Sequence, residues 1–230
     1  MSTREQFVGN ASKILGRDAV PKSVNPLEYR FQVHQEIMAD WSPEQLAAAF
    51  IEYSKAIGVD VYETTSTSIN DTLKDALVAL QANDVLLADD AQLRDWQTAE
   101  MLRQQFSVEV WNTNESREQN IRNADRAQVG IAVATLALAE SATVLLFSEG
   151  GNGRSVTLLP EATIYIVPQR VIKPRLTQGM ELIETARRQG ELPSSLNFVS
   201  GPSATSDIEL VRVVGVHGPM RVAHVVVTDL

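Results

Sequence analysis

Small hydroxyls, carboxylates and a histidine gather in two blocks near the end of the chain. Residues 200–209 read SGPSATSDIE, and residues 215–219 read GVHGP. Hydroxyl, carboxyl and imidazole groups hydrogen-bond anions and transfer protons, and the Gly and Pro residues between them favour tight turns. Loops held by a rigid scaffold commonly carry binding and catalysis. The two blocks are therefore candidates for a site of anion binding or proton transfer.

The first block also fits a purely structural interpretation. Its Gly-Pro pair favours a turn, and Ser203 or Ser206 could cap a following helix, with Glu209 at capping-box distance from Ser206. In that helix, Ser203 and Asp207 would share one face. Such a helix N-terminus either binds an anion through its backbone amides or uses its polar side chains only as a cap. The local sequence supports the two interpretations about equally.

A glycine-rich loop, residues 148–155 with the sequence SEGGNGRS, follows a predicted strand at 143–147. This is where a phosphate-binding loop lies in α/β proteins. The loop matches neither a P-loop nor G-x-G-x-x-G, because Lys-Ser/Thr is missing and Val156 replaces the third glycine. The alternative is a flexible connection. We favour a ligand contact, because Asn152 and Arg154 add an amide and a guanidinium suited to carboxylate or phosphate.

Two further titratable residues are candidates. His217, between two glycines, could act as acid, base or ligand near neutral pH, or fix the loop by hydrogen bonding. Neither His34 nor His224 stands at metal-ligand spacing from it, so we expect no metal site and assign both to structural roles. Glu140 follows small apolar residues and could be a buried carboxylate with perturbed ionisation, or an exposed charge.

Composition restricts the possible partners. The chain has 230 residues, a net charge of −9 and no cysteine. An acidic protein repels nucleic acid and anionic membranes, and a chain without cysteine has no thiol nucleophile, disulfide or thiolate ligand for an iron–sulfur cluster. The N-terminus lacks an apolar signal core, and no apolar run approaches the ~20 residues of a membrane helix. We therefore expect a cytoplasmic protein without membrane insertion.

Helical periodicity comes first along the chain, and strands then alternate with helices. The pattern predicts an N-terminal helical arm at 1–58, with helices near 3–16, 27–40 and 43–58, and an α/β domain at 59–230. Short β-branched strands between helices indicate a mostly parallel sheet covered on both faces. Predicted strands are 59–62, 84–87, 107–110, 129–133, 143–147, 163–167 and 222–228, and predicted helices are 69–81, 90–105, 134–140 and 176–189.

Several motifs in the second half of the chain occur in a fixed order. They are Gly130-Ile131, Ala139-Glu140, Glu149-Gly150 with Asn152-Gly153-Arg154, Leu158-Leu159-Pro160, Val167-Pro168, Ser200-Gly201-Pro202-Ser203 with Thr205, Asp207-Ile208-Glu209, and Gly215-Val216-His217-Gly218-Pro219. In this order the chain, from about Ala124 to Asp229, resembles the lactate-utilisation protein C family, also called the LUD-domain or YkgG-like family. It departs from the family pattern at 132–142, where Ala142 replaces a common glycine.

The resemblance implies a fold and a role. The fold is the three-layer α/β/α domain of the sugar-phosphate isomerase, deaminase and CoA-transferase superfamily, with a mostly parallel sheet. The role is that of a subunit in a bacterial three-protein system that oxidises L-lactate to pyruvate, whose other two members look like iron–sulfur proteins. A chain without cysteine fits that division of labour, so we expect no cofactor on this chain and iron–sulfur clusters in its partners.

We therefore expect a subunit that binds a small anionic ligand between the glycine-rich loop and residues 200–219. Alternatives are a stand-alone enzyme acting on a sugar phosphate or an acyl-CoA, and a scaffold without an active site. The residues expected to orient the ligand or transfer protons are Asp207, Glu209 and His217. Those expected to bind it are Glu140, Gly151, Asn152, Gly153, Arg154, Ser200, Gly201, Ser203 and Thr205.

Overall fold

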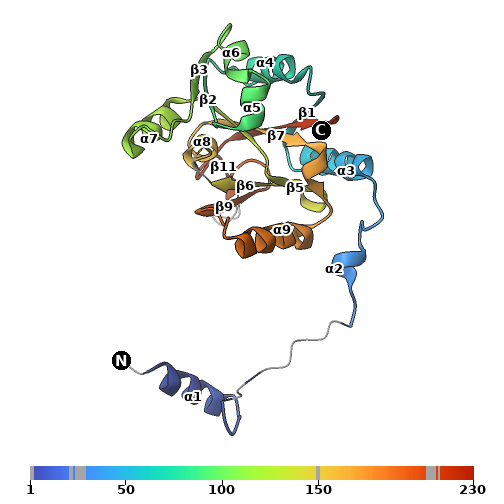
Figure 1. Cartoon of the computed structure of the whole chain (residues 1–230), viewed down its shortest axis with the longest axis vertical. Coiled ribbons are helices and arrows are strands. Elements are labelled where there is room, and N and C mark those ends of the chain that lie inside the picture. Colours follow the sequence, from blue (N-terminus) through green and yellow to red (C-terminus); the bar gives the residue numbers. More distant parts are fainter. Residues whose placement is uncertain (1–2, 21–22, 24–29, 149–150, 206–210, 212) are drawn as a thin grey trace. The chain divides into compact units, whose positions relative to one another are not determined.

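The computed structural model describes residues 3–20, 23, 30–148, 151–205, 211 and 213–230 (Figure 1). The chain divides into two compact units, Met1–Val33 and His34–Leu230. The first unit contains helix α1 (Arg4–Ile14), which begins at a capping box between Thr3 and Gln6. The predicted helix at 3–16 is therefore present and slightly shorter.

The second unit begins well before the domain boundary predicted at residue 58. Helix α3 (Pro43–Ala56) starts at the predicted cap, where Ser42 and Gln45 form a capping box. Phe50 on α3 is fully buried in the main hydrophobic core. The apolar face of α3 thus belongs to the α/β unit and not to an arm. Of the helix predicted at 27–40, only α2 (Val33–Glu36) is helical among the described residues.

Among the described residues, six parallel strands form the central sheet, in the order β1-β12-β7-β4-β2-β3. Every residue of β4 and β7 is buried, as expected for a parallel sheet covered on both faces. The predicted strands agree with these within two residues at each end. Their bounds are β1 (Asp60–Thr64), β2 (Asp84–Leu87), β3 (Ser107–Val110), β4 (Val129–Val133), β7 (Ala162–Pro168) and β12 (Arg221–Val227).

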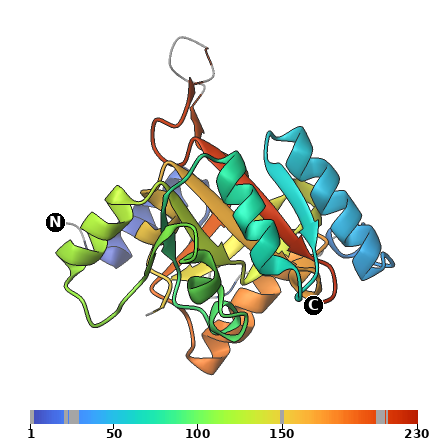
Figure 2. The same cartoon turned by 90° about the horizontal axis from the view of Figure 1, so that it is seen from above.

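Helices cover both faces of this sheet (Figures 1 and 2). One face carries α4 (Ile69–Ala79), α5 (Ala91–Asp95) and α6 (Thr98–Leu102), and the other carries α3, α7 (Arg117–Arg126) and α8 (Ser155–Leu158). The helix predicted at 90–105 is two short helices, because Gln97 takes a left-handed conformation (φ 53°) between them. The sequence prediction missed α7 and α8.

A second sheet adds a layer to the expected α/β fold, and it corrects the helix predicted at 134–140. Residues Leu136–Leu138 form strand β5, which pairs with β6 (Thr143–Ser148) and β8 (Ile172–Lys173), and β6 pairs with β9 (Ser195–Val199). Leu136 and Leu138 pack with Ile183 of α9 (Leu176–Gln189), whereas Ala137 joins the main core. Side chains alternate across a strand, so this sheet is apolar on both faces and forms an additional layer between the central sheet and α9.

The C-terminal block forms a hairpin where it is described. Strand β10 (Ala204–Thr205) pairs antiparallel with β11 (Val213–Val214). Because residues 204–205 are extended, Ser203 does not cap a helix, which corrects one structural interpretation of this block. Residues 206–210, where the rest of that helix was predicted, lie outside the described residues.

The helix α8 lies unusually close to the central sheet at Gly130 of β4. A Cβ atom at position 130 would overlap the carbonyl oxygen of Val156 on α8. Only glycine permits this approach, because every other residue carries that atom. The Gly-Ile pair of the sequence motif therefore fixes the position of α8.

We expect Gly130→Ala to lower the free energy of unfolding by about 3 kcal/mol or more, because the backbone of α8 must move. Urea unfolding measures this difference. Gly179→Ala on α9 is the matched control, since its Cβ would make ordinary contacts at 3.5 Å with Leu136 and Leu138. That change should stabilise the helix by up to about 1 kcal/mol. Equal stability of Gly130→Ala and wild type would contradict the assigned contact.

Candidate functional site

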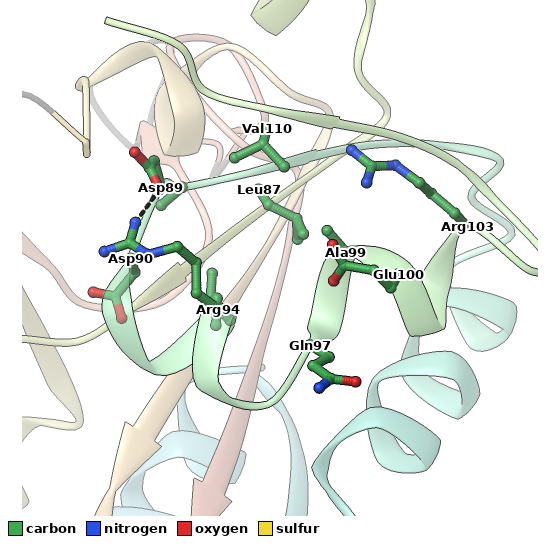
Figure 3. A pocket seen from close by; sticks show the side chains of 11 residues that line it. Leu87, Asp89, Asp90, Arg94, Gln97, Ala99, Glu100, Arg103 and Val110 are labelled. Carbon is green, nitrogen blue, oxygen red and sulfur yellow. Dashed lines mark hydrogen bonds and ion pairs between the residues drawn. The ribbon is translucent and has the colours of Figure 1, made fainter.

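Two cavities lie on opposite faces of the central sheet. The first, here called the loop cavity, has a volume of about 670 Å³ and lies on the face covered by α3 and α8. The second, here called the strand-end pocket, has a volume of about 550 Å³ and lies on the face covered by α5 and α6 (Figure 3). Strand register establishes the two faces: Tyr165 lies in the loop cavity and shares its face with Gly130, whereas Leu87 of the strand-end pocket lies on the other.

The loop cavity brings together the two C-terminal blocks that the sequence singled out. The amide of Ser203 donates to the carbonyl of Pro219 at 3.0 Å, and the amide of Gly215 donates to the carbonyl of Ser203 at 2.9 Å. Gly201 takes a positive φ of 76° beside Ile57. Five of the described residues lining the cavity come from 200–204 and three from 217–219: Ser200, Gly201, Pro202, Ser203, Ala204, His217, Gly218 and Pro219.

A chain of hydroxyl groups connects this cavity to residues 132–142, where the sequence departs from the family pattern. The Thr143 hydroxyl lies 2.6 Å from that of Ser200 and 2.7 Å from that of Ser141. Ala142 between them is buried and left-handed (φ 49°). This conformation explains why glycine suits the position, and alanine adopts it here at a cost of about 1–2 kcal/mol. The Ser141–Thr143–Ser200 chain is formed despite that substitution.

Tyr165 of β7 is a cavity residue that the sequence reasoning missed. Its side chain is fully buried at the loop cavity, and its hydroxyl lies near the side chains of Thr157 and Thr163 without a hydrogen bond of standard geometry. Burial raises the pKa of Tyr165, so the hydroxyl keeps its proton and can donate it in a hydrogen bond. The sequence signal that could have identified this residue was the one tyrosine in the largely apolar strand ATIYIVP.

His224 of β12 lies beside Tyr165 in the core. Its Nδ1 lies 2.9 Å from the Ser54 hydroxyl, and its ring stacks on Phe50 with centroids 4.9 Å apart. The Ser54 hydroxyl donates its only hydrogen to the carbonyl of Phe50. Its oxygen therefore accepts a hydrogen bond from the protonated Nδ1 of His224. Burial lowers the pKa of His224 to about 3, so the ring is neutral. Nε2 has no hydrogen-bond partner among the described residues.

The glycine-rich loop does not line the loop cavity where it is described. The amide of Asp89 donates to the carbonyl of Gly151 at 2.8 Å, and a Cβ on Gly153 would overlap the ring of Trp111. Both glycines therefore pack at the carboxyl ends of β2 and β3. Asn152 donates to the carbonyl of Phe147 at 3.4 Å. The structure thus separates Gly151–Gly153 from Ser200–Ala204, contrary to the arrangement expected from the sequence.

Three other expected site residues also lie outside the lining of the loop cavity. Arg154 is exposed, has no ion pair with any described residue, and stands one helical turn before Leu158, which lines the cavity. Glu140 pairs with Arg175 at 2.7 Å, and its side chain is 41% exposed, so it is not the buried carboxylate considered from the sequence. Thr205 lies in β10. Asp207 and Glu209 fall outside the described residues, and their roles stay predictions.

Neither a metal cluster nor a membrane span is found in the described ranges. No three His, Asp or Glu side chains gather there at metal-ligating positions. No helix in those ranges combines the length and the apolar character needed to cross a membrane.

The fold and the loop cavity define a parallel α/β protein with a polar-lined cavity on one face of its sheet. Comparison with known proteins then gives the family: the chain belongs to the LUD-domain family, whose model matches residues 47–227. It is 37% identical to "Lactate utilization protein C" of Geobacillus thermodenitrificans, covering 100% of this chain and 98% of that one. It is 33% identical to the protein of the same name from Bacillus subtilis, with the same coverage.

A solved structure supports the fold. The crystal structure of a DUF162 family protein from Deinococcus radiodurans superimposes with a TM-score of 0.61 at 23% identity, covering 81% of this chain and 99% of that chain. The sequence resemblance to the lactate-utilisation protein C family and the mostly parallel α/β fold are both confirmed.

The buried neutral His224 predicts how stability changes with pH. Its folded pKa of about 3 lies below the ordinary 6.5, so protonation favours the unfolded chain. As pH falls from 6.5 toward 3, this residue should remove up to about 1.4 kcal/mol of unfolding free energy per pH unit. Urea unfolding between pH 7.5 and about pH 4 should therefore show a shallower loss in His224→Phe than in wild type.

Ser54→Ala is the control, because it removes the hydrogen bond of His224 and keeps the imidazole. That variant should be less stable at every pH and retain the wild-type slope. Identical slopes in His224→Phe and wild type would contradict the burial of a neutral imidazole.

Proposed function

We propose that this chain is a subunit of a lactate-utilisation system and that its loop cavity binds a small carboxylate of the 2-hydroxy or 2-oxo acid class, such as L-lactate. The curated relatives carry the name lactate utilization protein C over the full length of the chain. The observation that carries the site assignment is the convergence of Ser200, Ser203 and His217 with the buried Tyr165 at one cavity. The Tyr165 hydroxyl makes no hydrogen bond of standard geometry with a described residue, so a ligand oxygen would complete its hydrogen bonding.

The lining suits such a ligand. The Tyr165, Ser200 and Ser203 hydroxyls offer hydrogen bonds to carboxylate and hydroxyl oxygens. Ile57, Leu158 and Phe198 supply an apolar wall for a methyl group. His217 is exposed at the cavity, where its imidazole is placed to hydrogen-bond the ligand or transfer a proton. Asp207 and Glu209, on the same segment of sequence, are proposed to assist in orienting the ligand or transferring protons.

Partner subunits are proposed to carry the electrons. Oxidation of a 2-hydroxy acid to a 2-oxo acid releases two electrons and two protons, and this chain has no cysteine to hold an iron–sulfur cluster. We therefore propose iron–sulfur proteins as partners, with substrate held on or beside this subunit.

Two alternatives are separated by simple observations. A stand-alone enzyme would turn over a sugar phosphate or an acyl-CoA without any partner. A scaffold would retain its partners after mutation of Arg154 and His217 and would bind no small carboxylate in the loop cavity.

We expect Tyr165→Phe to weaken binding of L-lactate or pyruvate about tenfold, because one hydrogen bond to a charged carboxylate is lost. Isothermal titration calorimetry on the purified full chain measures this change. The variant should fold at least as well as wild type, since it removes an unpartnered buried hydroxyl.

Tyr53→Phe is the matched control, because Tyr53 lies on the exposed side of α3 at 43% exposure. Its affinity for L-lactate should equal that of wild type. If Tyr165→Phe also binds with wild-type affinity, the loop cavity is not the carboxylate site.

The partner proposal makes a separate prediction. Affinity-tagged full chain, purified anaerobically from cells grown on L-lactate, should bring down cysteine-rich proteins together with iron and acid-labile sulfide. These partners should depend on the folded unit, so the destabilised Gly130→Ala variant should recover fewer of them. Recovery of the chain alone, without iron, from cells that consume lactate would exclude a stable iron–sulfur assembly.

A further inference from the structure

The strand-end pocket lies where the crossover connections diverge. The chain leaves β2 toward α5 and α6 on one face of the sheet, and leaves β3 toward α7 on the other. Open α/β sheets bind ligands beyond the carboxyl ends of their strands. The pocket occupies this place, between the ends of β2 and β3 (Figure 3).

An apolar floor makes the pocket fit for an organic ligand. Leu87 and Val110 are direct neighbours across the β2–β3 pairing, so their side chains point to the same face. Leu93 of α5 closes one side and Ala99 of α6 the other. With a volume of about 550 Å³, the pocket lies within the range of small-molecule sites.

Some charged groups at the rim of the strand-end pocket already have hydrogen-bond or ion-pair partners, and others do not. Asp89 is ion-paired with Arg94, and the Asp90 carboxylate accepts a hydrogen bond from the amide of Gln92 at 2.7 Å. Glu100 forms no hydrogen bond or ion pair with any described residue. Arg103 uses only Nε, which donates to the carbonyl of Val108 at 3.4 Å.

Glu100 and Arg103 therefore remain as one available anion and one available cation. They stand three residues apart, at neighbouring positions on the helix surface, yet they do not pair with each other. Figure 3 shows the Glu100 side chain on α6 and the Arg103 side chain at the end of that helix. A zwitterionic ligand has the two opposite charges that these groups would bind.

Other ligand classes fit less well. A phosphate would meet three carboxylates and only two guanidiniums, one of which is already paired with Asp89. A nucleobase binds by stacking on aromatic side chains, and none lines the pocket among the described residues.

We propose that the strand-end pocket binds a free α-amino acid with an apolar side chain. Arg103 binds its carboxylate through the terminal guanidinium nitrogens, and Glu100 binds its ammonium group. The apolar side chain of the ligand covers Leu87, Leu93 and Val110. The pocket is separate from the loop cavity, so the proposal stands independently of lactate binding.

Calorimetric titration of the purified full chain with L-leucine tests this inference. We expect saturable binding, and at least tenfold weaker binding in Glu100→Gln and in Arg103→Gln. The matched controls are Glu118→Gln and Arg117→Gln, two exposed residues of α7 away from both cavities, which should bind L-leucine as wild type does. 4-Methylpentanoate and 3-methylbutylamine, which lack the ammonium and the carboxylate, should each bind at least tenfold more weakly than L-leucine.

Three results would overturn the proposal. They are the absence of any heat of binding at millimolar L-leucine, wild-type affinity in both pocket variants, and displacement of bound L-leucine by saturating L-lactate. Thermal unfolding of the two pocket variants, whose altered side chains are exposed, shows whether each is folded before it is titrated.

Discussion

The close packing of α8 against β4 fixes one wall of the loop cavity. Gly130 has no side chain, so the backbone of Val156 lies directly on the central sheet. With α8 fixed there, its last residue, Leu158, forms part of the loop cavity. The loop that precedes α8 reaches the opposite end of the strands, where Gly151 meets Asp89 and Gly153 meets Trp111. The close contact at Gly130 thus holds the Leu-Leu-Pro segment at the loop cavity, while the glycine-rich loop makes its own contacts at the other end of the strands.

Polar groups inside the core give the loop-cavity face its character. The Tyr165 hydroxyl and the Nε2 atom of His224 are buried without hydrogen-bond partners among the described residues, on two adjacent strands of an otherwise apolar sheet. Each such group costs about 1–3 kcal/mol of stability. His224 is held by Ser54 and Phe50, which locks its ring orientation. Tyr165 instead borders the loop cavity, whereas His224 is not among the residues that line it.

Local sequence predicted the central sheet well because its strands are buried on both faces. Short β-branched runs such as β4 and β7 have no helical stripe, and the predicted bounds agree within one residue. It failed at 134–140, where the alanine-rich run favoured a helix. Pairing of β5 with β6 and β8 satisfies that backbone, and the alternation of Leu136, Ala137 and Leu138 between α9 and the core supplies the burial. Propensity was overridden by partners distant in sequence.

By itself, the sequence determined the family, the mostly parallel α/β class and the cap of α3, and it singled out the polar blocks 200–209 and 215–219. Those features rest on local patterns and on the order of motifs. Tertiary structure alone decided that the glycine-rich loop and Ser200–Ala204 lie in different places, that Glu140 is paired with Arg175, and that Tyr165 lines a cavity. The reason is physical: strand order and crossover side decide which chain segments meet, and neither is encoded in any single stretch of residues.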